Sequence, residues 1–264
     1  MPFERTSQQA FFGTSALLFV ASAALTIVRC GSMSAMGEMP MPGGRTMSMA
    51  WMPMPGQTWL SAAGLFLGMW VVMTVAMMLP SLVPTLWSYG ETVGNRDERR
   101  VNWLTALLGI GYFFVWTVFG VVVFPLGATL VEIEMQQPTL ARGVPIVIGV
   151  VVVIAGALQF SAWKAHHLAC CRKPSGRERT LPADAATAWR HGLRLGLHCT
   201  YGCAGFTAIL LVIGVMDLRM MALVTAAITA ERLAPNGQRV ARAIGIVVVG
   251  VGLLLMARAA AGLG

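Results

Sequence analysis

The sequence predicts an all-α membrane protein: a polytopic helix bundle with about seven transmembrane helices and a cytoplasmic N-terminus. Three observations predict it. Charged residues make up only 11% of the 264 residues, whereas soluble domains carry about 25%. Hydrophobic residues make up 56%, and they are gathered into long apolar runs separated by short polar segments. This composition excludes a disordered chain and an ordinary cytosolic enzyme.

The apolar runs give the expected helices in order. A bilayer core about 30 Å thick is crossed by about 20 mostly apolar helical residues. The sixth run is short and would reach only about 22 Å as a helix. Because proline interrupts helical hydrogen bonding, Pro80 and Pro84 are expected to end the second helix. The candidate spans are 10–28, 59–79, 103–124, 144–163, 195–216, 219–233 and 241–261.

The basic residues predict the orientation of these spans. Lys and Arg concentrate in cytoplasmic loops of membrane proteins. With a cytoplasmic N-terminus, 14 of the 19 Lys and Arg residues fall on the cytoplasmic side, half of them in the basic loop 164–194. The net charge of +8 is therefore mainly a topology signal. We expect a multi-pass protein of the bacterial inner membrane, in contact with the lipid bilayer and not with nucleic acid.

An alternative reading of the first span stays open. Ala21-Ser22-Ala23 is similar to a signal-peptidase site, so the span could be a cleaved signal peptide. Against this reading, Glu4 lies beside Arg5 in the n-region, and the apolar run is long for a signal peptide.

The outer loop 29–58 is rich in Met, Pro and Gly. Thioether sulfur is a soft ligand that selects Cu(I), and it binds without losing a proton, unlike a thiol. The alternative is a flexible segment whose methionines contact lipid headgroups or a protein partner. The methionines proposed to capture metal are Met33, Met36, Met39, Met41, Met47, Met49, Met52 and Met54.

The second span carries a stripe of methionines. Met69, Met73 and Met77 are four residues apart, so they share one face of a helix. One interpretation is a ladder of sulfur ligands for Cu(I). The other is helix packing by an adaptable side chain.

Cysteine and histidine gather near the expected cytoplasmic membrane edge. Several pairs are four residues apart and share a helix face. Thiolate and imidazole bind Cu(I) and Zn(II), and the methionines favour Cu(I) over Zn(II). The alternative is helix packing by small buried residues. The candidate metal ligands are His166, His167, Cys170 and Cys171, followed by His198, Cys199 and Cys203 at the start of the fifth span.

Short motifs are spread over residues 65–250: Gly68-Met69-Trp70, Ala76-Met77-Met78-Leu79-Pro80-Ser81, Tyr112 to Trp116, Lys164, Cys171-Arg172, Pro174, Cys199, Gly202-Cys203, Gly214-Val215-Met216, Glu231, Pro235 and Gly237. With these motifs the chain resembles an uncharacterised bacterial family of predicted metal-binding integral membrane proteins. The resemblance implies a multi-helix membrane domain and a bound metal. The chain departs from the family pattern at Ala204, where a second adjacent cysteine is usual, and at Arg232, where a lysine is usual.

These features lead to three hypotheses. The first is a protein that captures, transfers or transports Cu(I) through Met, Cys and His ligands. The second is a non-transporting accessory subunit of a membrane complex, in which the same residues pack helices or bind a protein partner. The third is a membrane thiol redox protein. An enzyme is not expected, because no nucleophile–base pair, phosphate-binding loop or HExxH motif is visible.

Overall fold

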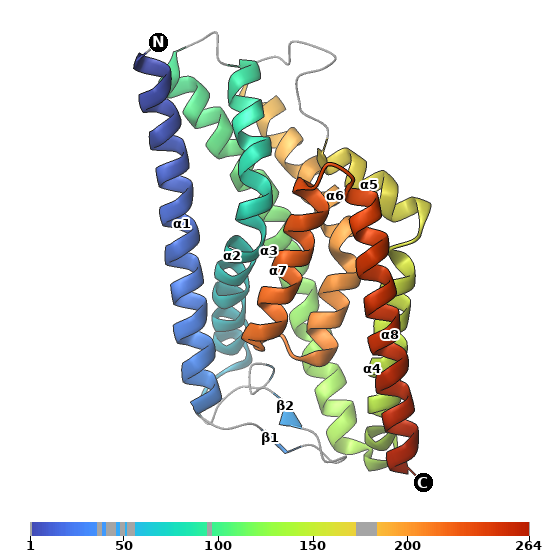
Figure 1. Cartoon of the computed structure of the whole chain (residues 1–264). Helices are drawn as coiled ribbons and strands as arrows, with labels where there is room; N and C mark the ends of the chain where they lie inside the picture. Colours follow the sequence, from blue (N-terminus) through green and yellow to red (C-terminus); the bar gives the residue numbers. More distant parts are fainter. Residues whose placement is uncertain are drawn as a thin grey trace.

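The computed structural model describes residues 2–35, 39–40, 46–47, 51, 56–93, 97–172 and 184–263. Within them, the chain forms eight helices arranged as one bundle (Figure 1). Two short strands, β1 (Met39–Pro40) and β2 (Thr46–Met47), pair antiparallel. The all-α class is therefore confirmed. The helices are α1 (Pro2–Ala35), α2 (Trp59–Val93), α3 (Glu98–Gln136), α4 (Pro138–Leu158), α5 (Ala162–Arg172), α6 (Ala185–Ile213), α7 (Leu218–Leu233) and α8 (Gly237–Leu263).

The count of seven membrane-crossing helices is not confirmed. Five of the described helices are long and apolar enough to cross a membrane, and the count rises to six if α4 and α5 form one bent span. The sixth predicted span is α7, which has only 16 residues. The chain nevertheless begins and ends at opposite ends of the bundle (Figure 1).

Helix α2 does not end at its prolines, which corrects the sequence prediction. It continues through Pro80 and Pro84 to Val93. After Pro80 it buries Leu82, Leu86 and Tyr89 in the core. This packing sustains the helix, because tertiary contacts contribute most of helical stability. Proline is also tolerated within apolar helices where neighbouring groups satisfy the freed backbone.

The helix predicted at 144–163 breaks near its end. Helices α4 and α5 meet at an angle of 65°. The hydroxyl of Ser161 accepts a hydrogen bond from the amide of Lys164 at 3.1 Å, which caps the start of α5. The turn lays α5 across the end of the bundle, beside the α7–α8 turn (Figure 1).

Helix α6 begins at Ala185, earlier than the predicted residue 195. The Asp184 carboxylate accepts hydrogen bonds from the Thr187 amide at 3.0 Å and the Thr187 hydroxyl at 2.7 Å. These bonds hold the pKa of Asp184 below its ordinary value. The earlier start places Cys199 and Cys203 well inside the helix instead of at its first turn.

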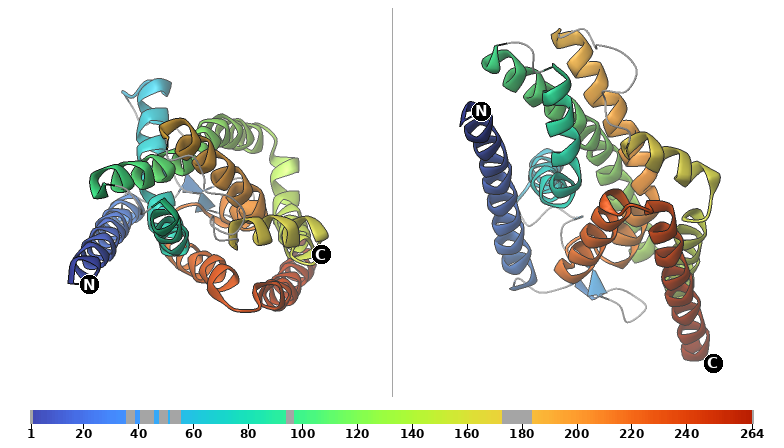
Figure 2. Two further views of the ribbon diagram at one scale, coloured as in Figure 1. Left: turned by 90° about the horizontal axis from the view of Figure 1, so that it is seen from above. Right: turned by 45° about the horizontal axis from the view of Figure 1, so that its top comes forward.

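The core lies where α2, α3, α6 and α7 meet. Leu108 and Tyr112 of α3 and Cys199 of α6 are fully buried. Seen from above, α1 lies at the periphery, and it packs on α2 (Figure 2). Most of α1 is exposed, as expected for a helix that faces lipid.

Small residues let α3 and α6 approach closely, and Gly192→Ala tests this contact. A Cβ at Gly192 would overlap the carbonyl oxygen of Leu108. We expect the substitution to lower the free energy of unfolding by about 1–3 kcal/mol, because backbone must move to relieve the overlap. Gly250→Ala is the control, since a Cβ there meets nothing within 4 Å. Equal melting temperatures for the two variants would contradict the close contact.

Candidate metal site

Three sulfur atoms from two helices meet in the core. Cys199 and Cys203 lie one turn apart on α6, and their Sγ atoms are 4.0 Å apart. The Cys199 Sγ lies 3.9 Å from Sδ of Met78 on α2. These three residues, which we call the sulfur triad, have exposed fractions of 3% or less. A pair of thiols and a thioether is therefore preassembled away from solvent.

Tyr112 of α3 orients the triad. Its hydroxyl donates a hydrogen bond of 2.8 Å to Cys199 Sγ. The ring is fully buried, so the hydroxyl has a fixed position and polarises the thiol at that point. A hydrogen bond of this kind also stabilises sulfur when it is deprotonated by metal binding.

Replacing Tyr112 by Phe removes this hydrogen bond and preserves the ring. We expect Tyr112→Phe to weaken metal binding at the triad about 10- to 100-fold, as the loss of outer-shell partners does at other metal sites. Titration with a competing chromogenic chelator measures the change. Tyr201→Phe is the matched control, because Tyr201 is exposed on the same helix as the cysteines. An equal effect of both substitutions would contradict the assignment.

A guanidinium lies beside the triad. Arg232 Nη2 donates to Cys203 Sγ at 3.9 Å and to Cys171 Sγ at 3.8 Å, and Nη1 donates to the Ser81 hydroxyl at 3.2 Å. Cys171 belongs to α5 and is buried. The guanidinium of Arg232, which belongs to α7, thus links Cys171 of α5 to Cys203 of α6.

A buried ion pair stabilises the same region. Lys164 Nζ of α5 lies 2.7 Å from Glu231 Oε2 of α7, and it also donates to the carbonyl oxygen of Gly202 at 2.7 Å. Gly202 immediately precedes Cys203. The pair therefore joins α5, α6 and α7 around the sulfur atoms.

The histidines form a separate group at the contact of α5 and α6. The Nδ1 atoms of His167 and His198 are 3.0 Å apart. Cys170 Sγ lies 3.7 Å from His166 Nε2, and the rings of His166 and His198 have centroids 6.2 Å apart. His198 precedes Cys199 in the chain, so the two groups are adjacent on α6 but face different directions.

The seven predicted Cys and His residues do not converge on one point. In the part of the chain that the structure describes, no group of three or more His, Cys, Asp or Glu side chains could hold a metal ion. The sulfur triad has three donor atoms only because the thioether of Met78 lies beside the two thiols. Sequence reasoning about the site missed Met78, although it lies beside Met77, because helix periodicity selected the neighbouring face.

The methionine stripe faces the bundle. Met73 and Met77 are buried, and Met69 is partly buried against the core. Met33 also packs against the core, and the strands place Met39 opposite Met47 in register. The other outer-loop methionines lie outside the described residues: Met36, Met41, Met49, Met52 and Met54.

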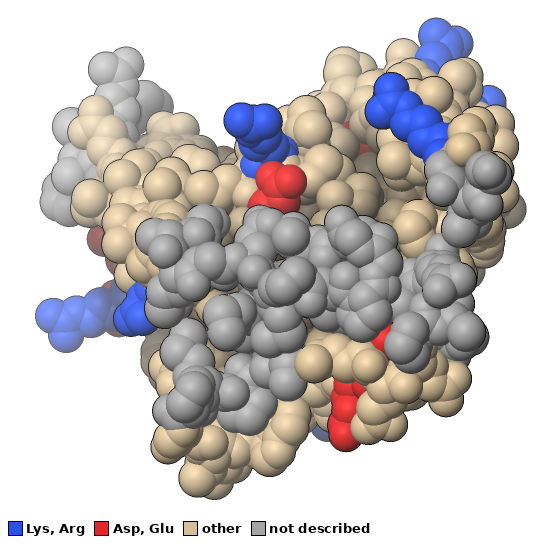
Figure 3. Space-filling model, turned by 90° about the horizontal axis from the view of Figure 1, so that it is seen from below, with Lys and Arg blue, Asp and Glu red and all other residues tan. Residues whose placement is uncertain are grey.

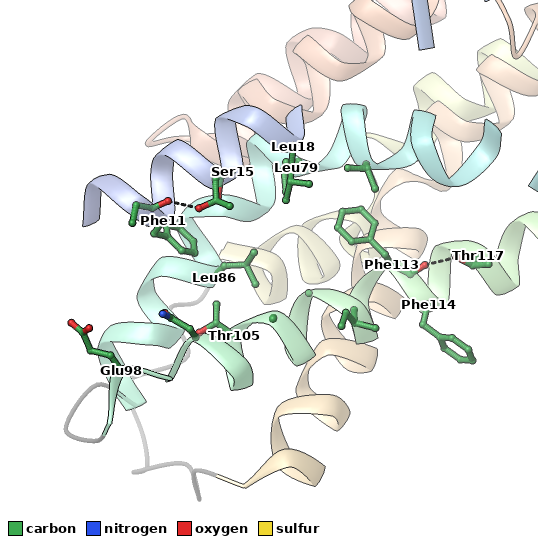
Figure 4. A pocket seen from close by; sticks show the side chains of 17 residues that line it. Phe11, Ser15, Leu18, Leu79, Leu86, Glu98, Thr105, Phe113, Phe114 and Thr117 are labelled. Atoms are coloured by element: carbon green, nitrogen blue, oxygen red, sulfur yellow. Dashed lines mark hydrogen bonds between the residues drawn. The ribbon is translucent and has the colours of Figure 1, made fainter. Parts of the chain in front are cut away.

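A large cavity lies away from the triad. It has a volume of about 1190 Å³ and lies between α1, α2 and α3, with Phe11, Leu18, Leu79 and Phe113 in its wall (Figure 4). None of the triad residues lines it. We place the candidate site at the triad, because the cavity lining is mainly apolar and offers no soft donor.

The fold and the triad define a helical protein with buried donors for a soft metal. A family model described as PpoB2, copper chaperone, matches residues 67–255. The chain belongs to this family, whose name indicates copper handling. No curated protein and no solved structure matches the chain.

Proposed function

We propose that the protein is a membrane-embedded copper chaperone that binds Cu(I) at Cys199, Cys203 and Met78. The observation that carries the proposal is the sulfur triad, in which Cys199 Sγ lies 3.9 Å from Met78 Sδ and 4.0 Å from Cys203 Sγ in the core. Soft sulfur donors select Cu(I) over harder ions. The copper chaperone description of the family supports the same ion.

The spacing of the sulfur atoms suits a three-coordinate ion. A metal–thiolate bond is about 2.3 Å long, so three sulfurs around one ion in a plane lie about 4.0 Å apart. The Cys199–Met78 and Cys199–Cys203 separations are 3.9 and 4.0 Å. Cu(I) can therefore enter with little movement of the backbone, and a preorganised site loses little affinity to ordering.

In this proposal, copper reaches the triad from the end of the bundle opposite the N-terminus. Residues 36–58 join α1 to α2 there, and uncharged residues cover most of the described part of this face (Figure 3). Under the positive-inside rule this is the outer side of the membrane. Methionines of the outer loop capture Cu(I), and Met69, Met73 and Met77 guide it along α2 toward Met78.

The route ends at the cytoplasmic side. In this topology α7 is a short seventh pass. The two ends of the chain lie at opposite ends of the bundle (Figure 1), and we infer that they face opposite sides of the inner membrane. Cys171 shares the Arg232 guanidinium with Cys203, and it receives copper from the triad on the way to an acceptor at this side. Movement inward explains why the outer loop offers thioethers, since thiols oxidise there, and why all the cysteines except Cys30 lie nearer the inner side.

Metal analysis tests the proposal. Full-length protein, purified in detergent under reducing conditions, is titrated with Cu(I) against a chromogenic Cu(I) chelator. We expect one tightly held equivalent, and we expect a deletion strain to show altered copper content. Protein that takes up no Cu(I), together with unchanged copper content in the strain, would overturn the proposal and favour the accessory-subunit hypothesis. A reversible disulfide detected by thiol trapping, without metal uptake, would favour the redox hypothesis.

A further inference from the structure

Arg232 is placed where a metal site ordinarily has no cation. Its guanidinium contacts the thiols of Cys171 and Cys203 and the hydroxyl of Ser81. Arginine stays charged in any protein environment. Among the described residues, Arg232 forms no ion pair with a carboxylate, whereas neighbouring Lys164 pairs with Glu231. The positive charge of Arg232 is therefore directed at the sulfur atoms.

We propose that Arg232 makes the triad selective for a monovalent soft cation over a divalent one. This inference rests on the proposed function, because it concerns the ion bound by Cys199 and Cys203. Bound as thiolates, these residues contribute two negative charges. A monovalent ion and the guanidinium contribute two positive charges, so the loaded site is neutral. A divalent ion leaves one positive charge uncompensated.

The uncompensated charge matters because of where the site lies. Cys199 and Cys203 are 0% and 3% exposed, and a net charge in such surroundings is poorly solvated. Arg232 Nη2 lies 3.9 Å from Cys203 Sγ, a distance at which charges interact strongly inside a protein. Thiolates also bind Zn(II), but repulsion from Arg232 disfavours this ion. Cu(I) is held in a site whose positive and negative charges cancel.

The test compares the affinities for Cu(I) and Zn(II) in the same full-length reduced protein. Arg232→Met removes the charge and keeps a long side chain, and we expect it to shift the Cu(I)-to-Zn(II) affinity ratio toward Zn(II) on the order of 100-fold. Arg232→Lys keeps the charge and should keep most of the preference. Arg239→Met is the matched control, because Arg239 is exposed at the start of α8, and it should leave the ratio unchanged.

A second variant tests the same inference if Arg232→Met does not fold. Ser81→Asp places a carboxylate beside Nη1 of an intact Arg232, which the native hydroxyl contacts at 3.2 Å. Neutralising the guanidinium in this way should shift the ratio in the same direction, whereas Ser81→Ala should not.

The outcomes separate this inference from the proposed function. Wild-type protein that binds Cu(I), with an unchanged ratio in Arg232→Met or in folded Ser81→Asp, would overturn the inference and leave the copper site standing. Wild-type protein that binds no Cu(I) would overturn both.

Discussion

Replacing Cys199 or Cys203 by serine is expected to lower the affinity for Cu(I) by more than about 100-fold, because a hydroxyl is a hard ligand and stays protonated where a thiol ionises. Cys199 should be the more sensitive position, since its Sγ lies 3.9 Å from Met78 Sδ and 4.0 Å from Cys203 Sγ. Met78→Leu, which removes a neutral donor of similar volume, should have a smaller effect. Chelator competition with the purified reduced proteins gives the three affinities.

Cys30→Ser is the matched control for loss of a buried thiol. Cys30 lies on α1 and is 1% exposed. Its Sγ donates to Sδ of Met216, in the α6–α7 turn, at 4.0 Å. It takes no part in the triad, so its substitution should leave the tight site intact. Retention of full affinity in a Cys199→Ser, Cys203→Ser double variant would show that copper binds elsewhere.

Breaking the Lys164–Glu231 ion pair should have the largest effect on stability. Both side chains are almost fully buried, at 6% and 2% exposure, and their charged atoms are 2.7 Å apart. Removing one partner leaves the other charge buried without its counter-ion, which costs about 3–5 kcal/mol. We expect Lys164→Met and Glu231→Gln each to lower the thermal midpoint of the protein in detergent.

The double variant separates charge from packing. Lys164→Met combined with Glu231→Gln removes both charges, so much of the lost stability should return. Glu132→Gln is the surface control, since Glu132 is exposed on α3, and it should change stability little. Additive losses in the double variant would show that the two residues stabilise the fold independently.

Local patterns in the sequence predicted the helices because a long apolar run has few other ways to satisfy its backbone. The runs marked the positions of the helices, but not where each one ends. The prolines of α2 were expected to stop it, yet buried contacts of Leu82 and Leu86 carry the helix onward. The bend before α5 depends on a cap at Ser161, which the continuous hydropathy of the segment conceals.

The candidate site also has one part that the sequence predicts and another that depends on how the helices pack. Spacing along one helix was enough to pair Cys199 with Cys203, since residues four apart share a face whatever surrounds them. Met78, Tyr112 and Arg232 come from three other helices, and their approach to those thiols is set by how α2, α3 and α7 pack against α6.

The sequence by itself thus determined the all-α class and the softness of the donors, while the orientation in a membrane that its charges indicate stays a prediction. Only the tertiary structure decided which sulfur atoms meet and which cation faces them. The physical reason is that periodicity describes neighbours within one helix, whereas a metal site and its charge balance are made by contacts between helices.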